Sequence, residues 1–156
     1  MLKAEKKSRR DQESIRNFSR SLPMALLRTR ETVMERFSPN LRAHDLTDQQ
    51  WRVLCALFDY GKKDLSDLAE VCCLLKPSIT RIIRAMEQRS LLEKQRDVKD
   101  QRRTIVSITS KGKDLISKVG PTSEKICKQI EAEFGAYELD GLYRRLDLLI
   151  TKLKKE

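Results

Sequence analysis

Residues 64–92 read DLSDLAEVCCLLKPSITRIIRAMEQRSLL, and this stretch predicts two short helices joined by a tight turn. Apolar side chains recur at helical spacing from Leu65 to Cys72. Pro77 suits the first turn of a second helix, which Ser78 helps to cap and which ends near Arg89. We expect the apolar residues of this second helix to face inward: Ile79, Ile82, Ile83 and Met86.

Two β-like segments follow at 92–96 and 104–109, and the second alternates apolar with polar side chains. They predict an antiparallel hairpin whose tip carries four cationic side chains and two aspartates. Cationic groups at such a tip can enter a minor groove, whose negative potential attracts them. The acids cannot favour contact with phosphates, so we assign Asp100 a structural role, in which it pairs with the guanidinium of Arg102.

Upstream, residues 46–61 predict a helix that begins with a capping box of Thr47 and Gln50 and stops at Gly61. Its apolar face is expected to hold Trp51, Leu54, Cys55 and Phe58. The order helix, short helix, helix, hairpin is that of a winged helix-turn-helix. The predicted fold is therefore mainly α with a small β-hairpin wing, and the winged lobe spans 46–110.

Both ends of the chain predict further helices. Residues 21–45 predict one helix with an irregularity near Pro39. Residues 111–156 predict two, the first capped by Thr109 or Ser110 and bent at Pro121. The last helix carries a stripe at heptad-like spacing: Leu139, Leu142, Leu146, Leu149, Ile150 and Leu153. Since a small domain has no other core for these residues, we expect both end segments to dimerise with a second copy.

The 156 residues have a formal net charge of +10, and two segments carry almost all of it. Residues 1–20, a basic arm expected to be flexible, hold seven basic and three acidic side chains, and 76–113 hold eleven and four. Such a concentration suits a polyanion, although a basic face that only aids solubility is the other interpretation. The chain has no apolar run long enough to span a membrane, and because residues 1–20 have no apolar core we do not expect them to act as a secretory signal.

The four cysteines, at 55, 72, 73 and 127, form no C-x-x-C pair, and His44 is the single histidine. This pattern predicts no metal site, no cofactor, and cysteines that act as small buried hydrophobic residues in a reduced, cytoplasmic protein. With one histidine and neither a phosphate loop nor a nucleophile motif, we do not expect an enzyme.

The strings LTDQQWRVLCAL (46–57) and DLSDLAEVCCLLKPSITRIIRAMEQRSLLEKQRDVKDQRRTIVSITSKG (64–112) resemble the MarR family of bacterial transcriptional regulators. The resemblance covers roughly 20–155. It implies a homodimer whose two winged lobes grip a pseudo-palindromic operator in double-stranded DNA, and which a small aromatic acid releases. Within the family, SLPMALLRTRE (21–31) and CCLLKPSITRI (72–82) point to repressors of aromatic catabolism, with homoprotocatechuate or 4-hydroxyphenylacetate as the compound.

On this interpretation the second helix of the lobe reads the major groove. Arg81 is the candidate for a bidentate contact to guanine, while Lys76 and Arg84 suit phosphates. Many wings of the family read D-x-x-D-R-R, but here Gln101 replaces the first arginine, so other wing cations can take its place. The predicted DNA-binding set is Lys76, Pro77, Ser78, Thr80, Arg81, Arg84, Lys99, Gln101, Arg102 and Arg103. The alternative is that the helix residues in this set form only the solvent-exposed face of an amphipathic helix and do not bind DNA.

An aromatic acid needs a cation for its carboxylate and an apolar shelf for its ring. Arg28 could supply the cation, Met24 and Trp51 the shelf, and His44 a hydrogen bond to a phenol. Trp51 could instead belong to the core, Arg28 could be a surface or intersubunit charge, and His44 could simply be exposed.

Two other functions remain open at this point. The first is a redox sensor on the same fold, which the resemblance disfavours, because peroxide-responsive relatives carry a cysteine early in the first helix and residues 1–54 have none. The second is a nucleoid-type protein that binds DNA without sequence preference, which the basic arm fits. The sequence does not separate repression from activation.

Overall fold

The computed structural model describes Phe18 and residues 21–154, so the arm predicted at 1–20 lies, apart from Phe18, outside the described residues. The chain divides into two compact units, Met1–Arg36 and Phe37–Glu156. The boundary falls inside helix α2 (Leu22–Ala43). This helix runs unbroken through Pro39, where the sequence predicted an irregularity.

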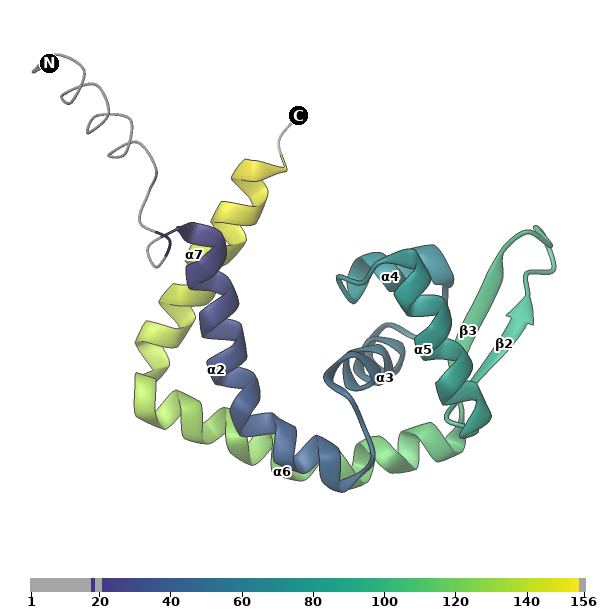
Figure 1. Cartoon of the computed structure of the whole chain (residues 1–156), viewed down its shortest axis with the longest axis horizontal. Coiled ribbons are helices and arrows are strands. Elements are labelled where there is room, and N and C mark those ends of the chain that lie inside the picture. The colour runs from purple at the N-terminus through teal and green to yellow at the C-terminus, as the bar shows by residue number, and fades with distance from the viewer. Residues whose placement is uncertain (1–17, 19–20, 155–156) are drawn as a thin grey trace, which may run out of the picture. The chain divides into compact units, whose positions relative to one another are not determined.

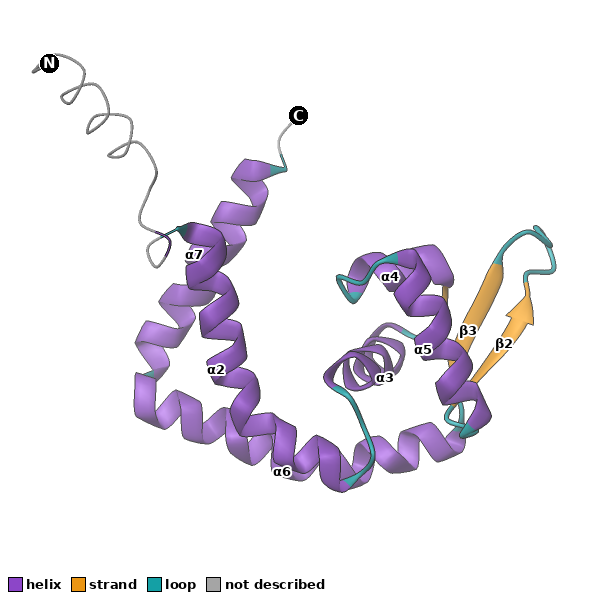
Figure 2. Ribbon diagram, viewed as in Figure 1, coloured by secondary structure: helices purple, strands orange, loops and turns teal. Residues whose placement is uncertain are grey.

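The second unit contains the rest of the described elements (Figures 1 and 2). In chain order they are α3 (Asp48–Tyr60), β1 (Lys63–Asp64), α4 (Leu65–Val71), α5 (Lys76–Gln88), β2 (Leu92–Arg96), β3 (Thr104–Ile108), α6 (Ser110–Phe134) and α7 (Ala136–Leu153). The predicted class, mainly α with a small hairpin wing, is confirmed. None of the helices described is both long and apolar enough to cross a membrane.

Helix α3 begins as the sequence predicted. The Thr47 hydroxyl accepts a hydrogen bond from the backbone N–H of Gln50 at 3.1 Å, and the Gln50 side chain accepts one from the backbone N–H of Thr47 at 3.0 Å. Gly61 caps the other end with a φ of 73°. The predicted apolar face is partly wrong: Phe58 is 52% exposed, whereas Val53 and Leu57 are buried. Two apolar stripes overlap on this helix, and spacing alone does not tell which one faces its neighbours.

The two predicted helices of the helix-turn-helix are present as α4 and α5. All four apolar residues expected on the inner face of α5 are buried. Leu75 is the N-cap of α5 and makes no side-chain capping bond, so the capping role predicted for Ser78 is not present; Pro77 in the first turn sets the start instead. From α3, the guanidinium of Arg52 donates to the Cys72 carbonyl at 2.7 Å and fixes the turn before α5.

The predicted hairpin is present, with β2 and β3 antiparallel from Leu92 opposite Ile108 to Arg96 opposite Thr104. A strand that the sequence did not predict, β1, pairs with the other edge of β3, so the strand order is β1-β3-β2. Two residues are too few for any periodicity to reveal a strand.

The carboxylate of Asp64 ties the wing to the helix-turn-helix. One of its oxygens accepts a hydrogen bond from the backbone N–H of Asp67 at 2.8 Å and so caps α4. The other accepts from Arg103 Nε at 2.9 Å and also from Arg103 Nη2. These hydrogen bonds, that to Asp67 first and that to Arg103 second, hold the pKa of Asp64 below its ordinary value. The Asp64 side chain is only 10% exposed.

A second junction lies where α6 begins. The Thr109 hydroxyl accepts from the backbone N–H of Gly112 at 3.1 Å, which confirms Thr109 as the cap. The same hydroxyl contacts the carbonyls of Ser90 and Leu91 at 2.7 and 3.0 Å, just after α5. A Cβ at position 112 would collide with the Leu91 carbonyl and the Ile108 side chain, so only glycine allows this close approach. From there α6 continues through Pro121 to Phe134, and the bend expected at Pro121 does not interrupt it.

We predict that Asp64→Asn lowers the free energy of unfolding by about 1–3 kcal/mol, because the variant loses a charge-assisted pair. Asparagine caps helices as well as aspartate does. Asp64→Ala, which also removes the cap, should therefore cost about 1 kcal/mol more. Urea unfolding at one protein concentration measures the stability of both variants. Asp67→Asn is the control, because Oδ2 of the exposed Asp67 side chain lies 3.9 Å from Arg103 Nη2 and makes only a weak ion pair.

The same pair gives a pH dependence. The pKa of Asp64 is lowered from 3.8 in the folded state, so its contribution is fully present above about pH 4 and is lost as the pH falls through the lowered value. The stability difference between the wild type and Asp64→Asn should therefore shrink as the pH falls below about 4. Parallel pH profiles for the two proteins would contradict the assignment.

We also predict that Gly112→Ala destabilises the fold by about 1–3 kcal/mol, because its methyl group has no room at the junction. Gly120→Ala is the matched control in the same helix, since a Cβ there meets nothing within 4 Å. That control should cost much less than Gly112→Ala, because lower backbone entropy offsets the crowding of its Cβ by the neighbouring ring of Pro121. Thermal unfolding of both variants tests the pair, and equal losses of stability would contradict the close approach at Gly112.

Candidate nucleic-acid interface

One face of α5 is exposed and cationic. Thr80, Arg81 and Arg84 are exposed, as are Lys76 and Pro77 in the first turn, whereas Ser78 is half-buried. The Thr80 hydroxyl donates to the Lys76 carbonyl at 3.1 Å, which leaves its oxygen able to accept. The side chains of Arg81 and Arg84 make no hydrogen bond or ion pair with any residue that the structure describes. These two guanidinium groups therefore remain available to an external anion.

The two aspartates of the wing shape its tip through the backbone. Asp97 Oδ1 accepts from the N–H of Lys99 at 2.8 Å, and Asp100 Oδ1 accepts from the N–H of Arg102 at 3.0 Å. The ion pair predicted between Asp100 and the Arg102 guanidinium is thus wrong, although Asp100 does structure the tip. In a turn, the backbone N–H two residues ahead lies closer to an aspartate than the end of a long side chain does.

The wing cations divide into two groups. Arg96 donates to the Gln101 carbonyl at 2.7 Å, and Arg103 binds Asp64, so both hold the wing together. The side chains of Lys99 and Arg102 have no such partner among the described residues. The Arg103 guanidinium is held by a carboxylate that lies 39 positions earlier in the chain, although half of its side chain is exposed, and its contact with DNA stays a prediction. Gln101 is exposed at the tip, and its contact with DNA stays a prediction.

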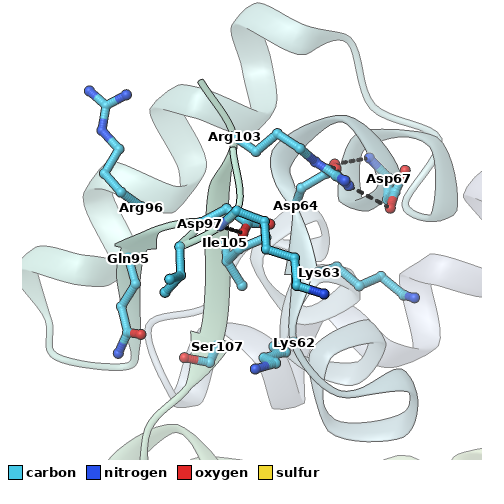
Figure 3. A pocket seen from close by; sticks show the side chains of 12 residues that line it. Lys62, Lys63, Asp64, Asp67, Gln95, Arg96, Asp97, Arg103, Ile105 and Ser107 are labelled. Carbon is cyan, nitrogen blue, oxygen red and sulfur yellow. Dashed lines mark hydrogen bonds and ion pairs between the residues drawn. The ribbon is translucent and has the colours of Figure 1, made fainter. Parts of the chain in front are cut away.

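A cavity of about 470 Å³ lies beside the base of the wing (Figure 3). In that view Arg103 points toward Asp64 and Asp67, while Arg96 points away from them. The sequence reasoning did not single out Asp64, although its place just before a helix made it a candidate cap. Two of the lining residues, Val98 and Ile105, are apolar and none is aromatic, so the cavity does not offer a shelf for an aromatic ring. The full lining is Lys62, Lys63, Asp64, Asp67, Gln95, Arg96, Asp97, Val98, Lys99, Arg103, Ile105 and Ser107.

The four predicted ligand residues are divided between the two units. Met24 and Arg28 lie on the part of α2 that belongs to the first unit; Met24 is half-buried and Arg28 is exposed. His44 and Trp51 lie in the second unit, and both are half-buried. Nδ1 of His44 is 2.9 Å from the Asn40 carbonyl, so this nitrogen is the donor. The ligand site as a whole stays a prediction.

Three of the four cysteines, at positions 55, 72 and 127, have raised pKa values, which disfavours redox sensing by these thiols. Burial raises the pKa of Cys55 to about 12, helped by Asp59, and burial also raises the pKa values of Cys72 and Cys127. A raised pKa keeps the sulfur as the less reactive thiol. The prediction that all four cysteines are buried is wrong for Cys73 and Cys127, which are exposed. Within the described residues, no three metal-ligating side chains are grouped.

Comparison with known proteins agrees with this geometry. A family model described as the MarR family matches residues 46–104, which is nearly the winged lobe alone. The chain is 37% identical over 131 residues to the homoprotocatechuate degradative operon repressor of Escherichia coli, a match that covers 84% of this chain and 88% of that protein.

Solved structures extend the likeness to the end helices. The crystal structure of the transcriptional regulator PA4135 has a TM-score of 0.82 at 35% identity and covers 87% of this chain and 98% of its own. NadR in complex with 4-hydroxyphenylacetate has a TM-score of 0.76 at 32% identity, with 90% and 98% covered. A cationic recognition helix, an anchored wing and relatives that match along most of their length lead to one conclusion: the chain belongs to the MarR family of transcriptional regulators.

Proposed function

We propose that this protein is a cytoplasmic, ligand-responsive repressor that binds a pseudo-palindromic operator as a homodimer and controls an operon for the catabolism of an aromatic acid. The observation that carries the DNA-binding part is the division of the cations. Arg81, Arg84, Lys99 and Arg102 are available to an external anion, while Arg96 and Arg103 hold the wing that presents them. The relatedness to the Escherichia coli repressor supports the choice of operon.

The two elements of the lobe suit two grooves of one duplex. A helix fits the major groove, which is about 12 Å wide, and Arg81 on the outer face of α5 can offer its fork to guanine. Lys76 and Arg84 then contact phosphates, which set the register without reading the sequence. The wing tip, with Lys99 and Arg102, reaches the neighbouring minor groove. Arg103 acts indirectly, because it keeps the wing at the angle that this contact needs.

The end helices support a homodimer. Helix α7 has no buried residue, although it carries the leucine stripe. Large apolar side chains of both end helices are exposed in the single chain: Leu22, Leu26, Leu27, Val33, Leu142, Tyr143, Leu148, Ile150 and Leu153. Apolar surface of this extent favours association with a second copy. A two-fold dimer presents two recognition helices to two half-sites, which is why the operator is pseudo-palindromic.

The effector is a small aromatic acid of the hydroxyphenylacetate class. The support comes from NadR, which binds 4-hydroxyphenylacetate in the solved complex and is 32% identical to this chain. Arg28 takes the carboxylate, Met24 and Trp51 contact the ring, and His44 offers a hydrogen bond to the phenol. By linkage, the acid must bind the DNA-free conformation more tightly than the DNA-bound one in order to release the operator.

For the DNA interface, we predict that Arg81→Ala reduces the preference for operator over unrelated DNA by about 1–3 kcal/mol. Lys99→Ala should instead weaken binding almost equally on all sequences and reduce the salt slope by about 1. Fluorescence anisotropy on the protein's own promoter region and on scrambled DNA, over a range of salt, measures both. Lys118→Ala on α6 is the charge-matched control. A wild-type protein that binds all sequences alike would indicate a nucleoid-type protein instead.

For the effector, we predict that Arg28→Ala blunts operator release by 4-hydroxyphenylacetate and leaves operator affinity unchanged without ligand. The neutral amide, 4-hydroxyphenylacetamide, separates a charge contact from a loss of shape, because it keeps the ring but lacks the carboxylate. The wild type should respond to the acid far more than to the amide, and Arg28→Ala should lose this preference. If Arg28→Ala still distinguishes acid from amide as the wild type does, Arg28 is not the carboxylate ligand.

A further inference from the structure

Hydrogen bonds join α6 to the last turns of α2 within the second unit. The side-chain amide of Asn40 donates to the Val119 carbonyl at 3.0 Å and to the Ser123 hydroxyl at 3.2 Å. Ser123 is one of the two polar side chains that are buried among the described residues. A buried hydroxyl that keeps a partner 83 positions away makes this a specific attachment and not an incidental surface contact.

From Asn40 the hydrogen bonds continue through the turn after α2 to the end of α5. The Asn40 carbonyl accepts from His44 Nδ1 at 2.9 Å. Arg89, the residue that caps the C-terminal end of α5, donates to the Asp45 carbonyl at 2.6 Å and to the His44 carbonyl at 3.4 Å. Asp45 has a φ of 53°, a conformation uncommon for residues other than glycine. Both terminal nitrogens of the Arg89 guanidinium therefore donate to one turn in a defined backbone conformation.

Both helices contain a proline beside the Asn40 contact. Pro39 precedes Asn40 in α2, and Pro121 lies between Val119 and Ser123 in α6. A proline has no N–H, so the carbonyls of Glu35 and Ser117 lack their usual helical donors. Helices bend most readily at such places. A small displacement of either helix at its proline would thus change the hydrogen bonds that the Asn40 amide makes with α6.

The recognition helix has a second attachment that bypasses this route. Thr109, at the start of α6, contacts the carbonyls of Ser90 and Leu91 just after Arg89. This contact fixes where α5 ends, whereas Arg89 determines how that end lies against the turn after α2. Arg89 also belongs to no part of the proposed DNA contact, so its role is indirect.

We propose that Asn40 and Arg89 are positioning residues in one hydrogen-bonded chain, made of Ser123, Asn40, His44, Asp45 and Arg89, that transmits a displacement of α2 or α6 to the recognition helix α5. The proposal rests on the proposed function, since it names how the same DNA-reading site is regulated. It requires that loss of the Asn40 amide loosens α5 although Asn40 does not touch α5. It also requires that Arg89 acts through the hydrogen bonds it donates to the turn after α2, and not through its positive charge.

The test is amide hydrogen exchange on the full-length protein, comparing the wild type with Asn40→Ala, Arg89→Met and Arg89→Lys. Asn40→Ala should accelerate exchange about fivefold or more in residues 86–92, at the far end of the chain of bonds. Arg89→Met should do the same in 41–47, and Arg89→Lys, which can still donate to one carbonyl, should restore part of the protection. Ser123→Ala removes one bond of Asn40 and replaces Asn40→Ala if that variant does not fold.

Arg42→Met is the matched control for Arg89→Met. It removes the same charge in the same region, but the Arg42 side chain is exposed and makes no hydrogen bond or ion pair with the described residues. Its exchange should equal that of the wild type. Peptides from α7 serve as the internal reference for global loosening. If Asn40→Ala changes exchange only in 37–47 and 117–125, or if all peptides including α7 exchange faster together, the chain of bonds does not transmit and the proposal fails.

A binding measurement on the same variants separates this proposal from the proposed function. Asn40→Ala and Arg89→Met should lower the ratio of promoter to scrambled-DNA affinity about fivefold or more, while Arg42→Met lowers both affinities alike and keeps the ratio. A wild type without promoter preference would overturn the proposed function, and the exchange data would still decide the chain of bonds. A promoter preference that Asn40→Ala and Arg89→Met leave intact would overturn the positioning role.

Discussion

The buried carboxylate of Asp64 is the contact on which the DNA-reading surface depends. It caps α4 through the backbone of Asp67 and binds the guanidinium of Arg103 at the base of the wing. The helix-turn-helix and the wing are therefore joined through one side chain. A two-stranded hairpin alone is marginally stable in water. With β1 added to β3 and Arg103 bound to Asp64, the wing acquires a fixed base, so its tip can be presented at a constant place relative to α5.

This anchoring explains why the wing carries so many charges of both signs. Asp97 and Asp100 accept backbone N–H groups and fold the tip, while Arg96 binds the Gln101 carbonyl and Arg103 binds Asp64. Lys99 and Arg102 are then left for an external anion. Ordering the tip before DNA arrives reduces the entropy that binding would otherwise cost. The acids thus serve the cationic surface indirectly, because they shape the loop that presents it.

The ends of the chain give the lobe its context. Helices α2 and α7 expose apolar side chains that a second copy would cover, and such a dimer sets the spacing of two recognition helices. Regulation then needs a route from those helices to α5. The bonds from Ser123 through Asn40 and the turn after α2 to Arg89 form a physical connection of this kind, attached at points where both helices contain a proline. A protein of this design responds to an effector by small shifts of packed elements.

The sequence by itself determined the elements that rest on local interactions: the capping box of α3, the inner face of α5 and the two strands of the hairpin, because spacing over a few residues decides each of them. Its resemblance to a family also placed the lobe between dimerisation helices. Only the tertiary structure decided which stripe of α3 is buried, that a two-residue strand joins the sheet, and that Arg103 serves Asp64. The last two features join residues 39 or more positions apart, and no local pattern specifies which distant partner a side chain meets.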